Sequence, residues 1–267
     1  MKKLTTSINE AEAILIFAGA GMSADSGLTT YQDKEGFYRD YPLYKKLNKN
    51  YVSMMSCQEL LADSQFAWGY FAHQYKLYSE ALPHEGYKKL LELCLSKEDY
   101  FVVTTNVDGL FKKAGFSANC VHEVHGSIHN LQCSIPCHRN IWLTEGINVE
   151  IDYSTMKVLD TLPCCPKCGF VSRPNICMYG DTDDSYVWEA ADENTKRFKE
   201  WRKKNQHKKM LIFEIGVGAE GLKRHSRMYR EVFSDATLAR VNPEKESIEY
   251  GDMINIQTGV KDAFVPL

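Results

Sequence analysis

Four short apolar runs, separated by stretches of helical character, limit the fold of this chain more than any other feature of its sequence. Each run is mostly apolar, as expected for strands that are buried on both faces of a parallel sheet. The runs lie at residues 13–17, 100–105, 210–216 and 236–241. Because strands alternate with helical stretches, we expect an α/β chain with a Rossmann-like, doubly wound parallel sheet.

The segments between the runs predict two additions to this sheet. Residues 56–95 have helical character, interrupted at Pro83, and the aromatic-rich stretch 31–51 is typical of a loop with short helices that could cover a ligand. Residues 133–173 are polar and rich in turns, which indicates a small inserted metal module. Within one domain, the expected parts are a large Rossmann-like part at 1–34, 84–131 and 174–267, a helical insertion at 35–83, and a zinc module at 132–173.

Bulk properties argue against several classes of function. The 267 residues carry a net charge of −3, so the chain lacks the excess of positive charge that is typical of nucleic-acid-binding proteins. No apolar run approaches the roughly 20 residues that a membrane-spanning helix needs. The start of the chain lacks the pattern of a secretory signal, and nine cysteines are an odd number. We therefore expect a cytoplasmic protein in a reducing compartment, with no nucleic-acid or membrane partner and with an oligomeric state that the sequence does not set.

Two cysteine pairs predict a structural metal site. Their spacing, with a long loop between the pairs, suits a tetrahedral Zn²⁺ ion at about 2.3 Å from each sulfur. Four protein ligands leave no coordination position for a substrate, so the ion should be structural. Cys164 is an alternative to Cys165, and His138 is a less favoured substitute. The predicted ligands are Cys133, Cys137, Cys165 and Cys168.

A glycine turn after the first apolar run indicates a nucleotide site. Backbone N–H groups at the start of the following helix would favour an anionic diphosphate, although a merely tight strand-to-helix connection is the alternative. The third glycine stands six places after the second instead of three, so the dehydrogenase fingerprint is absent. The cofactor-binding candidates in this turn are Gly19, Ala20, Gly21 and Ser23.

Polar residues after the second run are candidates for the same ligand, because the carboxyl ends of parallel strands converge on one crevice. Asn106 and Asp108 could hydrogen-bond a ribose and a carboxamide, and capping of the next helix is their alternative role.

His125 is the candidate general base, since histidine titrates near neutral pH. It follows a presumed strand at 121–124, and the adjacent Gly126 would permit close approach of a ligand. His122 and His129 compete for the same role.

In their order and spacing, these motifs resemble the sirtuin family, from about residue 13 to the C-terminus. The resemblance implies a reaction that consumes NAD as co-substrate and acts on an acylated lysine, with one structural zinc ion. The matching segments are Gly19-Ala-Gly-Met-Ser23 with Ser26-Gly27, Thr105-Asn-Val-Asp108, His125-Gly126, both cysteine pairs, and Arg173-Pro-Asn-Ile-Cys-Met-Tyr-Gly-Asp181.

The resemblance also implies roles for individual residues. His125 would take a proton from a ribose hydroxyl, Asn106 would order ribose and water, and Asp108 would hold the nicotinamide carboxamide. The segment from Ile176 to Gly180 resembles the strand that pairs with an acyl-lysine protein or peptide. The adenosine-side cofactor residues would be Gly216, Gly218 and Asn242.

The chain departs from the usual sirtuin pattern at several positions. Gln32 stands where an arginine is usual, while the neighbouring Tyr31 would keep a shielding role at the nicotinamide. Thr105 replaces a glutamine, and Val217 with Gly218 replaces a small hydroxyl-bearing pair. The Thr-Thr-Asn start at 104–106 and the segment 132–138 resemble macrodomain-linked microbial sirtuins, which transfer ADP-ribose to proteins.

The leading interpretation is an NAD-dependent protein-lysine deacylase that releases nicotinamide. It is favoured by His125 and by the segment 173–181, whose equivalents the macrodomain-linked enzymes typically lack. The alternatives are a protein ADP-ribosyltransferase, an NAD hydrolase, and a non-catalytic sensor of ADP-ribose or NAD.

Overall fold

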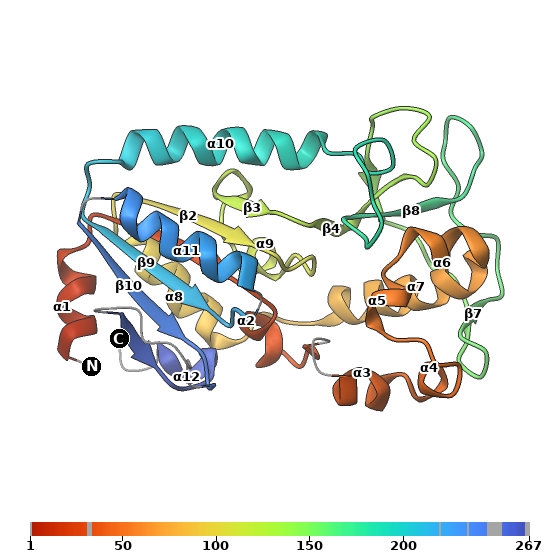
Figure 1. The fold of residues 1–267 in the computed structure, drawn as a ribbon, viewed down its shortest axis with the longest axis horizontal. Coiled ribbons are helices and arrows are strands. Elements are labelled where there is room, and N and C mark those ends of the chain that lie inside the picture. The colour runs from red at the N-terminus through yellow and green to blue at the C-terminus, as the bar shows by residue number, and fades with distance from the viewer. Residues whose placement is uncertain (1, 31–33, 219, 234, 245–252, 265–267) are drawn as a thin grey trace.

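A parallel sheet of six strands, in the order β11-β10-β9-β1-β2-β3, forms the larger part of the molecule (Figure 1). The computed structural model describes residues 2–30, 34–218, 220–233, 235–244 and 253–264. The strands are β1 (Ala13–Ala18), β2 (Asp99–Thr104), β3 (Val121–Glu123), β9 (Met210–Ile215), β10 (Ala236–Val241) and β11 (Ile254–Ile256). The four apolar runs are thus β1, β2, β9 and β10, and the predicted doubly wound sheet is confirmed.

Both faces of the sheet are buried around β1, which explains why that strand is apolar without alternation. In β1, Ile14 and Ile16 pack in one apolar cluster while Leu15 and Phe17 pack in another. The first cluster is covered by α1 (Lys2–Glu10), α8 (Glu85–Leu95) and α12 (Val260–Ala263), and the second by α10 (Glu189–Asn205) and α11 (Glu220–Val232) (Figure 1).

The order of the strands predicts a ligand crevice at the end of β1. The chain moves outward from β1 through β2 to β3, and then returns to β9, which pairs with the opposite edge of β1. In open α/β sheets, ligands bind where the strand order reverses in this way, beyond the carboxyl ends of the strands. Two short helices follow strands at this edge, α2 (Gly21–Ala24) after β1 and α9 (Leu110–Lys113) after β2, while the 3₁₀ helix η1 (Ala118–Cys120) directly precedes β3.

A second, smaller part lies beyond the carboxyl ends of the strands (Figure 1). Its antiparallel sheet has the order β5-β4-β8, and β6 pairs with β7 in a separate hairpin. These strands are β4 (Gly126–Cys133), β5 (Trp142–Leu143), β6 (Ile151–Asp152), β7 (Lys157–Val158) and β8 (Ser172–Ile176).

Helices of the expected helical insertion pack against this smaller sheet. They share one apolar cluster with Ile128, Leu131 and Ile176 from β4 and β8. The helices are α3 (Lys34–Asp40), α4 (Pro42–Lys46), α5 (Tyr51–Met54), α6 (Cys57–Ala62) and α7 (Ser64–Glu80). The helical character predicted for 56–95 is confirmed, with Pro83 between α7 and α8. The exact part boundaries at 35, 84, 132 and 174 stay a prediction.

Among the described residues, none of the helices combines the length and apolar character that crossing a bilayer requires.

Candidate active site

Glycines at the ends of β1 and β9 bring two backbones into direct contact. Gly21 donates its N–H to the Gly216 carbonyl at 3.0 Å, and Gly19 donates to the Ile215 carbonyl at 3.0 Å. A Cβ atom on Gly21 would lie 2.7 Å from Gly216 Cα, which is too close for any side chain, and Gly216 itself has φ of +57°. Ala20 is exposed as the N-cap residue of α2. The turn after β1 and the glycine after β9, assigned separately to the cofactor, therefore form one edge of the crevice.

Ser23, Asn106 and Asp108 form one buried hydrogen-bond network across this edge. Ser23 Oγ donates to Asp108 Oδ2 at 2.6 Å. The Asn106 amide donates to Ser23 Oγ and to the Gly19 carbonyl, each at 3.1 Å. Within the described part of the chain no group bonds Asn106 Oδ1, so this oxygen can accept from a ligand. Asp108 also accepts the Leu110 N–H at 2.9 Å, so the expected helix cap and the expected site residue are the same side chain.

Tyr87 completes the network, and no sequence pattern pointed to it. Its hydroxyl lies 3.0 Å from Ser23 Oγ, and because Ser23 gives its own proton to Asp108, Tyr87 must donate. Burial, with a contribution from the Asp108 charge, raises the pKa of Tyr87 well above 10, which keeps this donor protonated. Burial also raises the pKa of Asp108 above 3.8, against the opposing effect of its bonds to Ser23 and Leu110.

His125 lies in the turn between β3 and β4, and its side chain is exposed. Its carbonyl accepts the Cys177 N–H at 2.9 Å, which holds the turn against the end of β8. Although the side chain reaches solvent, surrounding protein desolvates it and lowers its pKa below 6.5, while a hydrogen bond to the Thr105 backbone opposes this shift. The imidazole is therefore mostly neutral at pH 7 and lies beside the residue that precedes Asn106.

The two competing histidines lie elsewhere. His122 is buried within β3, and burial, with a smaller effect of Arg197, lowers its pKa to about 4. His129 lies on β4, where its Nε2 is 2.9 Å from the Asp108 carbonyl oxygen. Of the three, His125 alone has an exposed side chain.

The reason for a glycine at position 126 differs from our expectation. Gly126 has φ of +79°, and a Cβ atom there would lie 2.1 Å from the Asn175 carbonyl oxygen and 2.4 Å from the Tyr186 hydroxyl. The space beside this glycine is thus filled by the protein's own β8 and Tyr186. Close approach of a ligand to Gly126 on this side was a wrong interpretation.

The predicted adenosine-side residues lie together at the ends of β9 and β10. Asn242 is buried, donates its side-chain amide to the Val217 carbonyl at 3.4 Å, and donates its N–H to the Ile256 carbonyl at 3.1 Å. Gly218 is exposed. Tyr31 and Gln32 lie outside the described residues.

The segment proposed to pair with a peptide is a strand only at its start. β8 ends at Ile176, and the residues after it form a turn that makes one isolated bridge, between Tyr179 and Ser56. The N–H groups of Cys177, Met178 and Tyr179 donate to the His125 carbonyl, to Asp181 Oδ2 and to the Met55 carbonyl. A strand over the full range 176–180 was therefore a wrong expectation, because the side chain of Asp181 folds the segment back on itself.

Four cysteine sulfurs gather at the far end of β4. All lie within 4.8 Å of one another, with 3.6 Å between Cys133 and Cys168 and 3.7 Å between Cys137 and Cys165. A tetrahedral ion about 2.3 Å from each sulfur sets them roughly 3.8 Å apart, so the cluster fits Zn²⁺. Cys164 is not part of the cluster, because its thiol points to the Leu162 carbonyl.

Comparison with known proteins agrees with this arrangement. The family model described as "Sir2 family" matches residues 19–200. Two curated relatives are NAD-dependent protein deacylases. One from Thermus thermophilus is 27% identical over 265 residues, which cover 97% of this chain and 91% of that protein. The one from Methylococcus capsulatus is 27% identical over 248 residues, which cover 92% and 88%.

Solved structures show the same fold at lower identity. A Sir2 homologue in complex with ADP-ribose superposes with a TM-score of 0.76 at 18% identity, covering 100% of this chain and 94% of that one. A Sir2 homologue in complex with NAD has a TM-score of 0.73 at 19% identity, with coverage of 100% and 91%. Since the family model spans more than half of the chain and includes the glycine turn, the Asn106–Asp108 segment, His125 and the cysteine cluster, this protein belongs to the Sir2 family.

Proposed function

We propose that this protein is an NAD-dependent protein-lysine deacylase that releases nicotinamide. The observation that carries the proposal is the setting of His125: an exposed, mostly neutral imidazole bonded to the backbone directly before Asn106. A base with a lowered pKa at the mouth of a nucleotide crevice suits removal of a proton from a sugar hydroxyl. The curated deacylase relatives support the same activity.

Each side chain in the network has a role under this proposal. NAD supplies an electrophilic ribose carbon once nicotinamide departs. Asn106 Oδ1 would accept from a ribose hydroxyl, while Asp108, held by Ser23, would accept from the nicotinamide carboxamide. His125 would take the proton of the ribose hydroxyl. The diphosphate would lie against the glycine edge formed by residues 19–21 and Gly216, although the Gly19 and Gly21 N–H groups already donate within the protein. Gly218 and Asn242 would lie on the adenosine side, and Tyr31 would shield the nicotinamide.

An acyl-lysine peptide or protein is the proposed substrate, bound along Ile176 to Gly180. A solved Sir2 structure with a deacetylated p53 peptide supports this class of partner. Because three N–H groups of this segment already donate within the chain, the peptide would have to use mainly its own N–H groups. Backbone pairing of this kind recognises sequence weakly.

The same occupied N–H edge favours a second candidate, a protein ADP-ribosyltransferase. If peptide pairing is weak, the activated ribose can be intercepted by another nucleophile of a protein acceptor. Thr105 and the segment 132–138 support this candidate. Interception by water alone would give an NAD hydrolase, the third candidate.

One experiment separates these activities. A panel of acyl-lysine peptides is incubated with and without NAD labelled in its adenosine part, and the products are weighed by mass spectrometry. A deacylase removes the acyl group only with NAD and leaves proteins unlabelled. Labelled protein indicates a transferase, and nicotinamide release that does not depend on any acceptor indicates a hydrolase.

His125→Ala is the matched control for that experiment. For an enzyme, turnover should collapse while ADP-ribose binding survives, because under this proposal the imidazole would act at the sugar and not at the adenosine side. A protein that binds NAD but never releases nicotinamide, with His125 or without it, would instead be a sensor, and the deacylase proposal would be wrong.

We also propose a structural zinc ion at Cys133, Cys137, Cys165 and Cys168, and a cytoplasmic, reducing setting. The described residues support the setting through nine unpaired thiols, four of them grouped in a metal-type cluster.

A further inference from the structure

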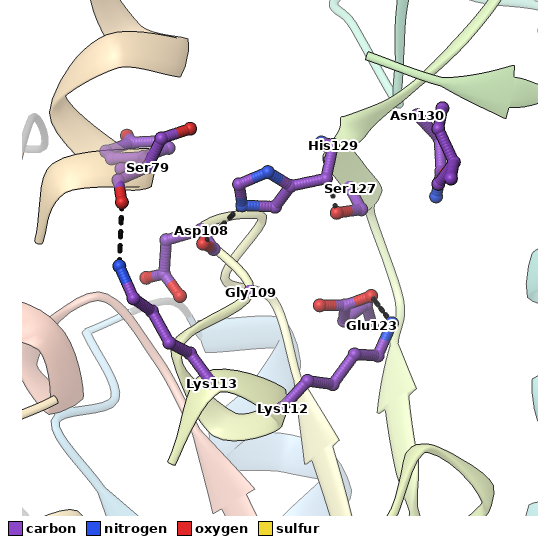
Figure 2. Close-up of a pocket in the computed structure, with 11 residues that line it drawn as sticks. Ser79, Asp108, Gly109, Lys112, Lys113, Glu123, Ser127, His129 and Asn130 are labelled. Atoms are coloured by element: carbon purple, nitrogen blue, oxygen red, sulfur yellow. Dashed lines mark hydrogen bonds and ion pairs between the residues drawn. The ribbon is translucent and has the colours of Figure 1, made fainter. Parts of the chain in front are cut away.

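The proposed reaction gives no task to His129, a histidine in contact with the candidate site. It lies on β4, half-buried, four residues after His125. Its Nε2 is 2.9 Å from the Asp108 carbonyl oxygen (Figure 2). Since a carbonyl can only accept, Nε2 must carry the proton, which assigns the tautomer of this ring.

β4 holds two consecutive carbonyls of the segment that carries the proposed nicotinamide contact. The Ile128 N–H donates to the Val107 carbonyl at 3.1 Å, and His129 donates to the next one, that of Asp108. The first bond is a backbone contact that any residue at position 128 except proline could make. The second depends on the side chain at position 129.

The imidazole is itself fixed from two sides. The ring of Tyr75 on α7 packs edge-on against it, with 5.8 Å between centroids. On the other side, a Cβ atom on Gly109 would lie 2.8 Å from His129 Cδ2, so the ring lies directly against the Gly109 backbone. A ring held in this way can fix the direction of the Asp108 carbonyl and not merely contact it.

A cavity of about 420 Å³ lies beside His129, lined also by Asp108, Gly109, Glu123 and Lys112 (Figure 2). Its lining does not include Ser23, Asn106 or His125, but it shares Asp108 with the proposed cofactor crevice. Without the imidazole, water from this cavity could reach the Asp108 carbonyl and satisfy it. Loss of the bond should therefore cost little stability while the peptide loses its fixed orientation.

We propose that His129 is a positioning residue, which orients the Asp108 peptide through the Nε2–H to carbonyl bond so that the Asp108 carboxylate faces the nicotinamide. The inference rests on the proposed function for the identity of the ligand. The orientation of the peptide itself does not depend on that function.

Three variants test this role. His129→Phe keeps a ring against Tyr75 and Gly109 but removes the hydrogen-bond donor, whereas His129→Gln keeps a donor. His207→Phe is the control, because it changes an exposed histidine far along the chain. By titration calorimetry, His129→Phe should weaken NAD binding by about three- to tenfold, the worth of one hydrogen bond. ADP-ribose binding should be unchanged, because that ligand lacks nicotinamide. His129→Gln should recover most of the NAD affinity, and His207→Phe should match the original protein.

Two measurements on the ligand-free protein decide the inference separately from the proposed function. Nitrogen NMR shifts should show the proton of His129 on Nε2, and hydrogen exchange over residues 105–110 should be faster in His129→Phe with little change in Tm. Any of three results would overturn the positioning role. These are a His129 proton on Nδ1 instead of Nε2, unchanged hydrogen exchange in His129→Phe, and equal loss of NAD and ADP-ribose affinity together with a lower Tm in that variant. Failure of the original protein to bind NAD would instead overturn the proposed function.

Discussion

The carboxylate of Asp108 is the side chain whose change has the most specific expected effect. In Asp108→Asn, the amide oxygen can still accept the Leu110 N–H and keep the cap of α9, but the negative charge is lost. Inhibition by nicotinamide should therefore weaken about tenfold or more, in line with the loss of a charged hydrogen bond, while ADP-ribose binding stays within about twofold. Inhibition assays measure the effect of nicotinamide, and titration calorimetry measures the binding of ADP-ribose.

Asp262→Asn is the matched control for this change, since Asp262 is exposed on α12. It should leave both quantities unchanged. Equal losses of nicotinamide inhibition and of ADP-ribose affinity in Asp108→Asn would contradict the role assigned to the carboxylate.

The lowered pKa of His125 predicts the pH dependence of turnover. Desolvation disfavours the imidazolium, so the neutral base persists to lower pH than in a solvated histidine, whose pKa is 6.5. The acid limb of the kcat/KM profile should therefore fall below pH 6.5, with activity lost as pH falls and retained as pH rises through 7. A limb centred above pH 6.5 would contradict this assignment.

A functional residue could be predicted from the sequence when it stands within a recognisable local motif, and not when it reaches the site from a distant element. Asn106, Asp108 and His125 stand at strand ends, where the position alone suggests a ligand. Tyr87 reaches Ser23 from α8, 64 positions away in the chain, and an aromatic residue on a helix face is normally core. The need for glycine at position 126 was predicted, but the reason for it was not. The neighbouring strand β8 leaves no room for a side chain there, and no local sequence pattern indicates that strand.

The turn after β8 is held by a buried ion pair. Arg173 and Asp181 bond through two pairs of atoms, at 2.6 and 2.7 Å, with both side chains almost inaccessible to solvent. Burial alone would raise the pKa of Asp181, but the bonds and charge of Arg173 hold it below 3.8. The pair also fixes the proposed substrate segment, since Arg173 donates to the Ile176 carbonyl and Asp181 accepts the Met178 N–H.

Asp181→Asn should lower the free energy of unfolding by about 3–5 kcal/mol, because it leaves the Arg173 guanidinium buried without a counter-charge. Urea unfolding measures the loss. As a control, Glu85→Gln breaks the exposed pair of Lys88 and Glu85 and should cost less than about 1 kcal/mol. A similar small cost for Asp181→Asn would show that water reaches Arg173.

The cysteine cluster predicts which thiols carry metal. Cys133→Ser and Cys168→Ser should each lose bound zinc and lower Tm, because metal binding and folding of such a module are coupled. Cys164→Ser should keep both, since the Cys164 thiol lies outside the cluster. Zinc content by mass spectrometry and thermal unfolding give the answer, and full zinc in Cys133→Ser would refute the ligand set.

Strands could be predicted where both faces are buried, and not where one face meets loops. β1 is continuously apolar and β9 and β10 are mostly so, because clusters on both sides of the sheet enclose them. β4 begins with Gly-Ser-Ile-His and mixes buried with half-buried positions. The sequence therefore did not indicate that this strand leaves the main sheet and joins a second one. The turn after Ile176 was misjudged for a similar reason, since its course depends on Arg173.

The stability of the complete fold should depend on pH through His122. This buried histidine has a pKa of about 4 against 6.5 in the unfolded chain, and its Nδ1 has no partner within the described part of the protein. Between pH 6.5 and 4, the unfolded state binds the proton more readily than the native state. The free energy of unfolding should therefore fall as pH falls, by up to about 1.4 kcal/mol per pH unit from this group, with no contribution above pH 6.5.

His122→Leu isolates that effect, because it removes the titrating ring from β3 and leaves the other groups in place. Unfolding midpoints in urea, measured from pH 7.5 to 4, should decline less steeply for the variant than for the original protein. Parallel curves would show that His122 remains neutral in both states or is already solvated in the native one.

The contact between Gly21 and Gly216 joins segments almost two hundred positions apart, and it restricts how this protein can change. A methyl group on either residue would press into the other backbone, so neither half of the crevice can be remodelled alone. Under the proposed function, redesign of cofactor preference would have to begin from Val217, Gly218 or Asn242, since the two glycines can be replaced only if both strand ends move apart.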